Sequence, residues 1–128
     1  MSASNVDLVK AGYEAFGSGD MDAVMQLLQD TEWHEAAGTP WGGVSQGSEA
    51  ILTNVFGPIM QQITDFKATP KELMPAGDNC VLSVGNYTGK GPGGDLDARF
   101  AHLWRFTDGK CTHFEQFADS ALMRDVVG

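Results

Sequence analysis

The stretch LDARFAHLWRF, residues 96–106, alternates in character with the two-residue period of a β-strand. One face carries the even-numbered residues Leu96, Ala98, Phe100, His102, Trp104 and Phe106. Because this face is almost wholly apolar, it is predicted to point into the protein interior. His102 is the single polar residue on it, so its imidazole is expected to lie among aromatic rings.

The opposite face of the same stretch mixes charged and apolar side chains. It carries Arg99 and Arg105 together with Ala101 and Leu103. A mixed face of this kind suits a partly polar subunit interface, so a homodimer is predicted.

Three other runs rich in strand-forming residues accompany this one, at about 66–75, 80–89 and 111–119. The segment Gly77-Asp78-Asn79 predicts a first hairpin turn, and Asp108-Gly109 predicts a tight one. The glycine-rich residues 89–94 predict a longer, flexible connection.

The first half of the chain has helical periodicity instead. Apolar residues three and four apart over residues 6–16 predict an amphipathic helix, with Ser4 as its N-cap and Gly17 as its stop. A second helix is predicted to begin at Asp20.

A third helix is expected after a cap at Ser48, and Pro58 should kink or split it because proline has no backbone N–H. Before it, residues 31–35 predict a short strand and residues 37–43 an irregular loop. Helices followed by a meander of strands indicate an α+β fold, in which three N-terminal helices pack on a curved antiparallel sheet. Residues 1–128 are expected to form a single domain.

The composition narrows the function classes. The net charge of −9 should repel nucleic acids and anionic membrane surfaces. No apolar run approaches the roughly 20 residues of a membrane helix, and no secretory leader pattern is recognised, so cytoplasmic residence is predicted. Cys80 and Cys111 are expected to be free thiols in strands.

Two motifs, one near each end, carry a resemblance to a known superfamily. The first is AFGSGDMD at residues 15–22 followed by DTEWHE at 30–35, and the second is HLWRFTDGK at 102–110 followed by FAD at 117–119. Together they resemble SnoaL-like polyketide cyclases and ketosteroid isomerases, of the same superfamily as nuclear transport factor 2. The resemblance implies a cone-shaped α+β barrel (cystatin-like) with an apolar pocket between helices and sheet. It also implies a small apolar or cyclic ligand.

The resemblance points to three candidate catalytic residues. Glu35 is at the position of the isomerases' general base, and strand alternation puts it on the same face as Trp33. His102 is where these enzymes carry a protonated aspartic acid that donates to the oxyanion. Asp119 matches the acid/base of the cyclases, or else caps the last helical turn. For Glu35 and His102 the alternatives are a solvated carboxylate and a hydrogen-bonded core histidine.

A departure from the isomerase pattern lies in the first helix. Gly12 is at the position of the catalytic tyrosine, and Tyr13 is turned about 100° away from it. The polar site is therefore expected to lack that tyrosine, which argues against steroid isomerisation.

Aromatic residues are expected to form most of the core and to line the pocket. Trp41, in a Gly/Pro loop, is predicted to be a lid over the ligand or a dimer contact. The substrate-binding candidates are Tyr13, Trp33, Trp41, Phe56, Phe100 and Trp104. Further aromatic residues assigned to the core are Phe66, Tyr87, Phe114 and Phe117.

No cofactor and no metal site are predicted. His34 and Glu35 point to opposite faces of a strand, and His113 with Glu115 is a pair that is usually solvated. These features favour a cofactor-independent isomerase, cyclase or lyase that transfers a proton on a small carbonyl compound.

Two alternatives remain open. One is a non-catalytic binding protein that uses the same pocket. The other is an epoxide-hydrolase-like set of Asp97, Arg99 and Asp119, although alternation places Asp97 and Arg99 opposite His102.

Overall fold

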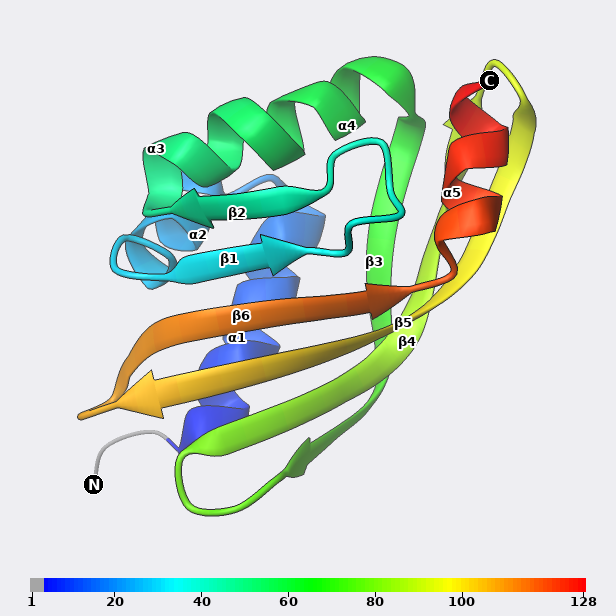
Figure 1. Ribbon diagram of the computed structural model, residues 1–128. Coiled ribbons are helices and arrows are strands. Elements are labelled where there is room, and N and C mark those ends of the chain that lie inside the picture. The colour runs from blue at the N-terminus through cyan, green and yellow to red at the C-terminus, as the bar shows by residue number, and fades with distance from the viewer. Residues whose placement is uncertain (1–3) are drawn as a thin grey trace.

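The computed structural model describes residues 4–128 and confirms the α+β class: one curved sheet, with helices packed against it (Figure 1). The elements in chain order are α1 (Asn5–Ser18), α2 (Met21–Leu27), β1 (Glu32–Glu35), β2 (Gly43–Gln46), α3 (Ser48–Ile51), the π-helical turn η1 (Leu52–Phe56), α4 (Gly57–Gln62), β3 (Thr64–Pro75), β4 (Cys80–Gly91), β5 (Gly94–Thr107), β6 (Lys110–Ala118) and α5 (Ser120–Val127).

The six strands form a single sheet in the order β2-β1-β6-β5-β4-β3. Strands β3 to β6 make the predicted antiparallel meander. Strand β1, however, pairs with β6 in parallel, so the sheet is mixed rather than antiparallel throughout. Strand β2 was not predicted. It follows the loop after β1 and pairs with β1 in antiparallel orientation.

The first two helices begin where their capping residues predict. The Ser4 hydroxyl accepts a hydrogen bond from the Asp7 N–H at 3.1 Å, and the Asp20 carboxylate accepts one from the Ala23 N–H at 3.2 Å. The prediction that Gly17 stops this helix is wrong: α1 ends at Ser18, and Gly19 is its C-cap. That residue has the left-handed φ of 79° that favours glycine after a helix.

The third helical segment is divided, as Pro58 predicts: η1 separates α3 from α4, and Pro58 lies in the first turn of α4. Immediately before the proline the chain widens into η1, where the Gly57 N–H bonds the Leu52 carbonyl. A π-helical turn is a known way for a helix to accommodate an interrupted hydrogen-bond ladder. Ser48 is the first residue of α3 rather than its cap, and Gly47 in the cap position makes no side-chain bond.

The connection between β4 and β5 is shorter than predicted. Gly91 pairs with Gly94, so the expected flexible segment is a tight hairpin turn instead. At the end of β6 the chain continues into the eight-residue helix α5, which packs its buried Met123 and Val126 inward. Val126 lies beside the hairpin, where its carbonyl accepts from the Gly93 N–H.

Alternation along β5 is as predicted. The even-numbered side chains from Leu96 to Phe106 are buried, and His102 is 3% exposed. Phe117 was assigned to the core but is 51% exposed, because in β6 it lies on the face opposite Phe114. The inner face of the sheet and the helices thus enclose the core.

Two further sequence expectations bear on the molecule as a whole. Cys80 and Cys111 are both free, as predicted. Across residues 4–128, none of the helices combines the length and apolar character needed to cross a bilayer.

Candidate active site

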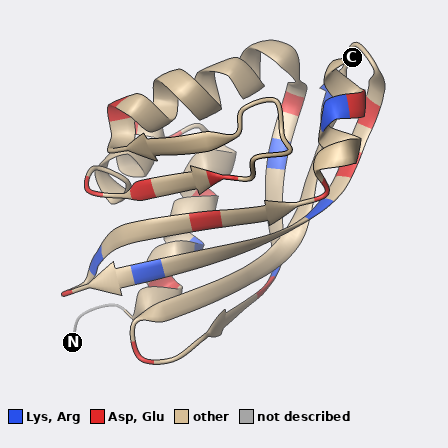
Figure 2. Ribbon diagram, viewed as in Figure 1, with Lys and Arg blue, Asp and Glu red and all other residues tan. Residues whose placement is uncertain are grey.

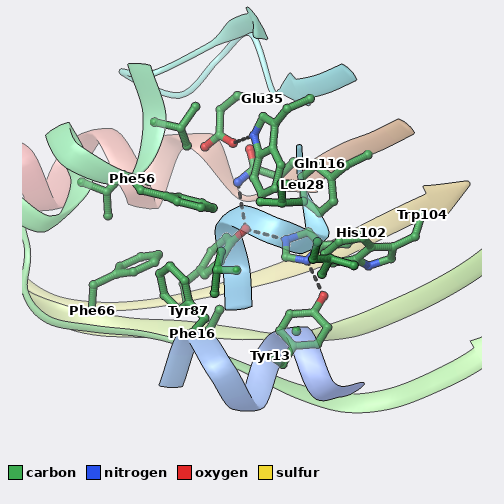
Figure 3. A pocket seen from close by; sticks show the side chains of 18 residues that line it. Tyr13, Phe16, Leu28, Glu35, Phe56, Phe66, Tyr87, His102, Trp104 and Gln116 are labelled. Carbon is green, nitrogen blue, oxygen red and sulfur yellow. Dashed lines mark hydrogen bonds between the residues drawn. The ribbon is translucent and has the colours of Figure 1, made fainter. Parts of the chain in front are cut away.

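A small, largely apolar pocket lies between the helices and the inner face of the sheet (Figure 3). Its cavity volume is about 60 Å³. Residues from α1, α2, η1 and α4 line one side, and residues from β1, β3, β4, β5 and β6 line the other. The polar groups among the lining residues are those of Tyr13, Trp33, Glu35, Tyr87, His102, Trp104 and Gln116.

His102 is held between two tyrosine hydroxyls. Its Nδ1 lies 2.5 Å from the Tyr13 hydroxyl and its Nε2 lies 2.5 Å from the Tyr87 hydroxyl. Phe100 stacks on the imidazole at 4.0 Å between ring centroids, with the planes 10° apart. Both ring nitrogens therefore have partners inside the protein, and the ring is fixed from its face as well.

The chain of hydrogen bonds extends beyond the two tyrosines. At one end, the Ala36 N–H donates to Gln116 Oε1 at 3.0 Å, which leaves the Gln116 amide N–H to donate to the Tyr87 hydroxyl at 2.8 Å. At the other end, the Ser83 hydroxyl lies 2.5 Å from the Tyr13 hydroxyl. The direction of donation is thereby fixed at the Gln116 end.

One bond at the Ser83 end, the bond from Trp104, also has a fixed direction. Trp104 Nε1–H, which can only donate, bonds the Ser83 oxygen at 3.1 Å. Between the two fixed ends, hydroxyls and a neutral imidazole can each both donate and accept, so the protons can be arranged in two ways.

In the first arrangement Tyr87 donates to Nε2, Nδ1–H donates to Tyr13, and Tyr13 donates to Ser83. The Ser83 hydroxyl then bonds the His102 carbonyl at 3.5 Å. In this arrangement each hydroxyl proton of the chain has an acceptor within the protein.

In the second arrangement the three bonds between Ser83, Tyr13, His102 and Tyr87 are reversed, and the bond from Ser83 to the His102 carbonyl is lost. Ser83 donates to Tyr13, Tyr13 donates to Nδ1, and Nε2–H donates to Tyr87. Tyr87 now accepts from both His102 and Gln116, so its own O–H is free to donate to a molecule in the pocket.

Burial keeps these groups uncharged. Desolvation lowers the pKa of His102 to about 3, so the imidazole is neutral at physiological pH. Desolvation also raises the pKa of Tyr13 and of Tyr87 above the usual value, so both hydroxyls keep their protons. The network is therefore a chain of neutral donors and acceptors.

Glu35 is the carboxyl group of the pocket. It is 4% exposed, and its Oε1 accepts a hydrogen bond from Trp33 Nε1 at 2.9 Å. Its Oε2 is buried and has no hydrogen-bond partner. Desolvation raises the pKa of Glu35 to about 7, although the bond from Trp33 opposes the shift. A carboxylate with this pKa is a competent base near neutral pH.

Comparison with known proteins gives the family. The model of the SnoaL-like domain matches residues 9–114. The chain belongs to the SnoaL-like family. No curated protein sequence matches it significantly.

Solved structures support the same fold. An NTF2-like protein from Burkholderia thailandensis is 30% identical, with a TM-score of 0.92 over 99% of each chain. An NTF2-like protein of unknown function from Burkholderia pseudomallei is 24% identical, with a TM-score of 0.87 over 98% of each chain. TerC, co-crystallised with polyporic acid, is 22% identical, with a TM-score of 0.84 over 98% of each chain.

The three predicted catalytic residues of this SnoaL-like domain do not all line the pocket. Glu35 and His102 both line the pocket. Asp119 is not among the lining residues; it is exposed and its carboxylate accepts from the Leu122 N–H at 3.2 Å, as the N-cap of α5. The alternative interpretation of Asp119 as a helix cap is confirmed, because the chain turns directly from β6 into α5 at this residue.

Four of the six substrate-binding candidates, Tyr13, Trp33, Phe56 and Trp104, line the pocket of the SnoaL-like domain. Phe100 does not, since it lies behind the His102 ring on which it stacks. Trp41 does not line it either: the side chain is 7% exposed and belongs to the core, so it is neither an open lid nor a surface contact.

The expectation that the polar site lacks a tyrosine is wrong. Tyr13 reaches His102 from α1 in spite of its offset from position 12. Gly12 lies against α2: a Cβ atom there would lie 2.6 Å from Leu27 Cδ2, so the Leu27 side chain would have to move to accommodate it.

Sequence reasoning missed Gln116 and Ser83 and assigned Tyr87 only to the core. Gln116 lies directly opposite His102 on β6, on the same inner face as Phe114. A lone polar residue on an apolar strand face was the signal that identified His102, and the same signal was present for Gln116 and Ser83. The epoxide-hydrolase-like set does not form at the pocket, since Asp97 and Arg99 are exposed on the outer face.

Proposed function

We propose that this SnoaL-like domain is a cofactor-independent enzyme, an isomerase, cyclase or lyase, that transfers a proton on a small cyclic or polyketide-like carbonyl compound. The observation that carries the proposal is the buried, unpaired Oε2 of Glu35 in an apolar pocket that also contains tyrosine hydroxyls. An unpaired buried carboxylate oxygen is costly to keep, so a functional reason for it is expected.

Glu35 is the general base in this proposal. Its Oε2 takes a proton from the carbon next to the substrate carbonyl, and the C–H electron pair moves towards the carbonyl oxygen, which becomes an enolate. Trp33 holds the other carboxylate oxygen, so the group keeps its orientation while it gains and loses the proton. Return of the proton to another carbon completes an isomerisation.

Tyr87 is the donor to the developing enolate oxygen. The sequence suggested that His102 itself would donate, but both of its ring nitrogens are bonded to tyrosines. In the second proton arrangement, Tyr87 receives bonds from His102 and Gln116 and directs its own O–H to the substrate. His102 is then a positioning residue that acts through Tyr87.

The size and lining of the pocket favour a small, largely apolar substrate. A cavity of about 60 Å³ has room for only a few water molecules, well below the 300 Å³ or more that is usual for drug-sized ligands. A ring-sized substrate therefore requires the lining side chains to move apart. The similar fold of TerC, crystallised with polyporic acid, supports a ring compound as ligand.

The test needs no knowledge of the natural substrate. Abstraction of a proton next to a carbonyl exchanges it with solvent, so the protein is incubated in D₂O with a panel of cyclic ketones beginning with cyclohexanone and 2-cyclohexenone. Deuterium incorporation is measured by NMR and mass spectrometry. Wild-type protein should accelerate exchange, and Glu35→Gln should reduce it to background.

Further substitutions distinguish the role of Tyr87 from that of Glu35. Tyr87→Phe should slow exchange about a hundredfold, the usual loss for one oxyanion donor. Glu49→Gln removes an exposed carboxylate from α3 and should have no effect. Full exchange activity in Glu35→Gln would overturn the proposal.

A non-catalytic binding function is the second candidate. It is favoured by the first proton arrangement, in which no donor of the network is left for a substrate. Ketones that bind, as seen from changes in tyrosine and tryptophan signals, but never exchange would support it.

The homodimer also remains a proposal. Phe117 is 51% exposed on the outer face of the sheet, where it pairs in register with Ala101, and Val44 of β2 is 60% exposed. Burial of these apolar groups would favour association through this face. Sedimentation analysis should give a dimer for the wild type and a monomer for Phe117→Lys; a monomeric wild type would refute the idea.

A further inference from the structure

We propose that Glu32, His34 and His113 form a binding site for a divalent transition-metal ion, with Zn²⁺ as the best match, on the outer face of β1 and β6. The pocket is on the other face of the same strands, so this site is separate from the proposed active site. It does not depend on the proposed function.

The parallel pairing of β1 with β6 brings the three residues together. Glu32 lies opposite His113 in the register, and His34 lies two residues along β1 on the same face. Potential ligand atoms of the three side chains all lie within 4.8 Å of one another. They therefore converge at one place on two neighbouring strands.

The distances match a tetrahedral ion. Glu32 Oε2 is 2.8 Å from His34 Nε2 and 3.6 Å from His113 Nδ1. Ligand atoms about 2.0–2.1 Å from a tetrahedral zinc ion are about 3.3 Å apart, between these two values. Small side-chain rotations would place all three around one ion, and solvent would occupy the fourth position.

Glu115 lies beside one of the proposed ligands, His113. Its Oε1 lies 3.5 Å from His113 Nε2, the nitrogen that points away from the cluster. A carboxylate beside Nε2 favours the tautomer with its proton on that nitrogen, which leaves the lone pair of Nδ1 directed at Glu32. Carboxylate, histidine and metal in this order are a recurring arrangement in zinc proteins.

Charge and ligand type favour a transition metal. Acidic residues lie on both strands in this part of the sheet, in a chain of net charge −9 (Figure 2). Two imidazoles with one carboxylate suit zinc, nickel or copper, whereas magnesium and calcium prefer oxygen ligands.

In the strand register, one positively charged and two uncharged side chains lie next to the proposed ligands. Arg105 of β5 lies opposite His113 in the register, but its guanidinium N–H donates to Cys80 Sγ at 3.4 Å, towards β4. Gln46 and Val44 of β2 lie opposite Glu32 and His34. The side chains of His34 and His113 are 34% and 23% exposed in the single chain, so an ion in solution can reach them there.

Calorimetric titration of tag-free protein with ZnCl₂ at pH 7.5, in a buffer that does not chelate zinc, tests the site. One ion should bind per chain. His34→Ala, His113→Ala and Glu32→Gln should each weaken binding at least tenfold. Glu115→Gln should weaken it about tenfold, as is usual for loss of a carboxylate behind a ligating histidine. Circular dichroism verifies that each variant is folded.

Two controls make the result specific. Glu72→Gln removes the same charge from exposed β3, at the other edge of the sheet, and should bind zinc like the wild type. In NMR spectra, zinc should shift the imidazole signals of His34 and His113 but not those of His102.

Three results would each overturn the proposal. They are a wild type that binds no zinc, binding that survives in a His34→Ala/His113→Ala double variant, and binding that is lost in Cys80→Ser.

Discussion

Replacing Glu35 by glutamine should make the protein more stable at alkaline pH and leave its stability almost unchanged at acid pH. Glutamine is nearly isosteric, and its carbonyl can still accept the hydrogen bond from Trp33 Nε1. What the substitution removes is the need to bury a negative charge.

The size of the effect follows from the shift in pKa. Burial raises the pKa of Glu35 from 4.5 to about 7, and at about 1.4 kcal/mol per pH unit this corresponds to about 3 kcal/mol. Below pH 4.5 the carboxyl is protonated in both the folded and the unfolded protein, so it does not contribute. Between pH 4.5 and 7 the unfolded chain binds fewer protons, so the stability of the wild type falls as pH rises.

Urea denaturation followed by tryptophan fluorescence, at intervals from pH 4.5 to 8, measures the free energy of unfolding. The difference between Glu35→Gln and the wild type should grow from near zero to about 3 kcal/mol in favour of the variant. Glu49→Gln removes an exposed carboxylate and controls for the change in net charge. A difference that does not vary with pH, or a variant that is less stable at pH 8, would refute the assignment of Glu35 as a buried base.

Four other predictions concern the pocket and the residues around it. Because burial lowers the pKa of His102 to about 3, its imidazole NMR signals should not move between pH 5 and 8; a titration in that range would show that the ring is accessible to water. Trp41 Nε1 is buried without a partner, so Trp41→Phe should change the free energy of unfolding by less than about 1 kcal/mol, because removing an unpaired donor offsets the lost ring area. By contrast, Trp33→Phe breaks the bond to Glu35 and should cost about 2 kcal/mol or more in the same urea assay. Asp119→Ala should cost about 1 kcal/mol through loss of the α5 cap and leave ketone exchange intact; loss of exchange would return Asp119 to the list of catalytic residues.

Local patterns in the sequence predicted most of the fold. The alternation in residues 96–106 placed His102 inside, and the capping residues Ser4 and Asp20 located two helix starts. These features depend on neighbours within a few residues, which a sequence displays directly. Strand β2 and the π-helical turn η1 were missed because the first depends on pairing with β1 and the second on how the hydrogen-bond ladder adjusts before Pro58.

The candidate site was predictable only in part, for the same reason. Glu35 came from family resemblance together with alternation, but the hydrogen-bond partners of His102 come from α1 and β4, and the amide that bonds Tyr87 comes from β6. Whether an offset of one residue puts Tyr13 within reach of the imidazole depends on how α1 crosses the sheet. The metal-binding cluster needed the parallel pairing of β1 with β6, which no local pattern indicates.

Burial shifts the pKa values of Glu35 and His102 in opposite directions, and the proposed chemistry needs both effects. It raises the pKa of Glu35 to about 7, so that the carboxylate can take and return a proton near neutral pH. It lowers the pKa of His102 to about 3, so that the ring stays neutral and must accept at one nitrogen if it donates at the other. Tyr87 can therefore donate to a substrate only if His102 carries its proton on Nε2, and this in turn requires Tyr13 to donate to Nδ1. The hydroxyl of Ser83, two hydrogen bonds away from His102 Nδ1, is thus coupled across the ring to the direction in which Tyr87 points its proton.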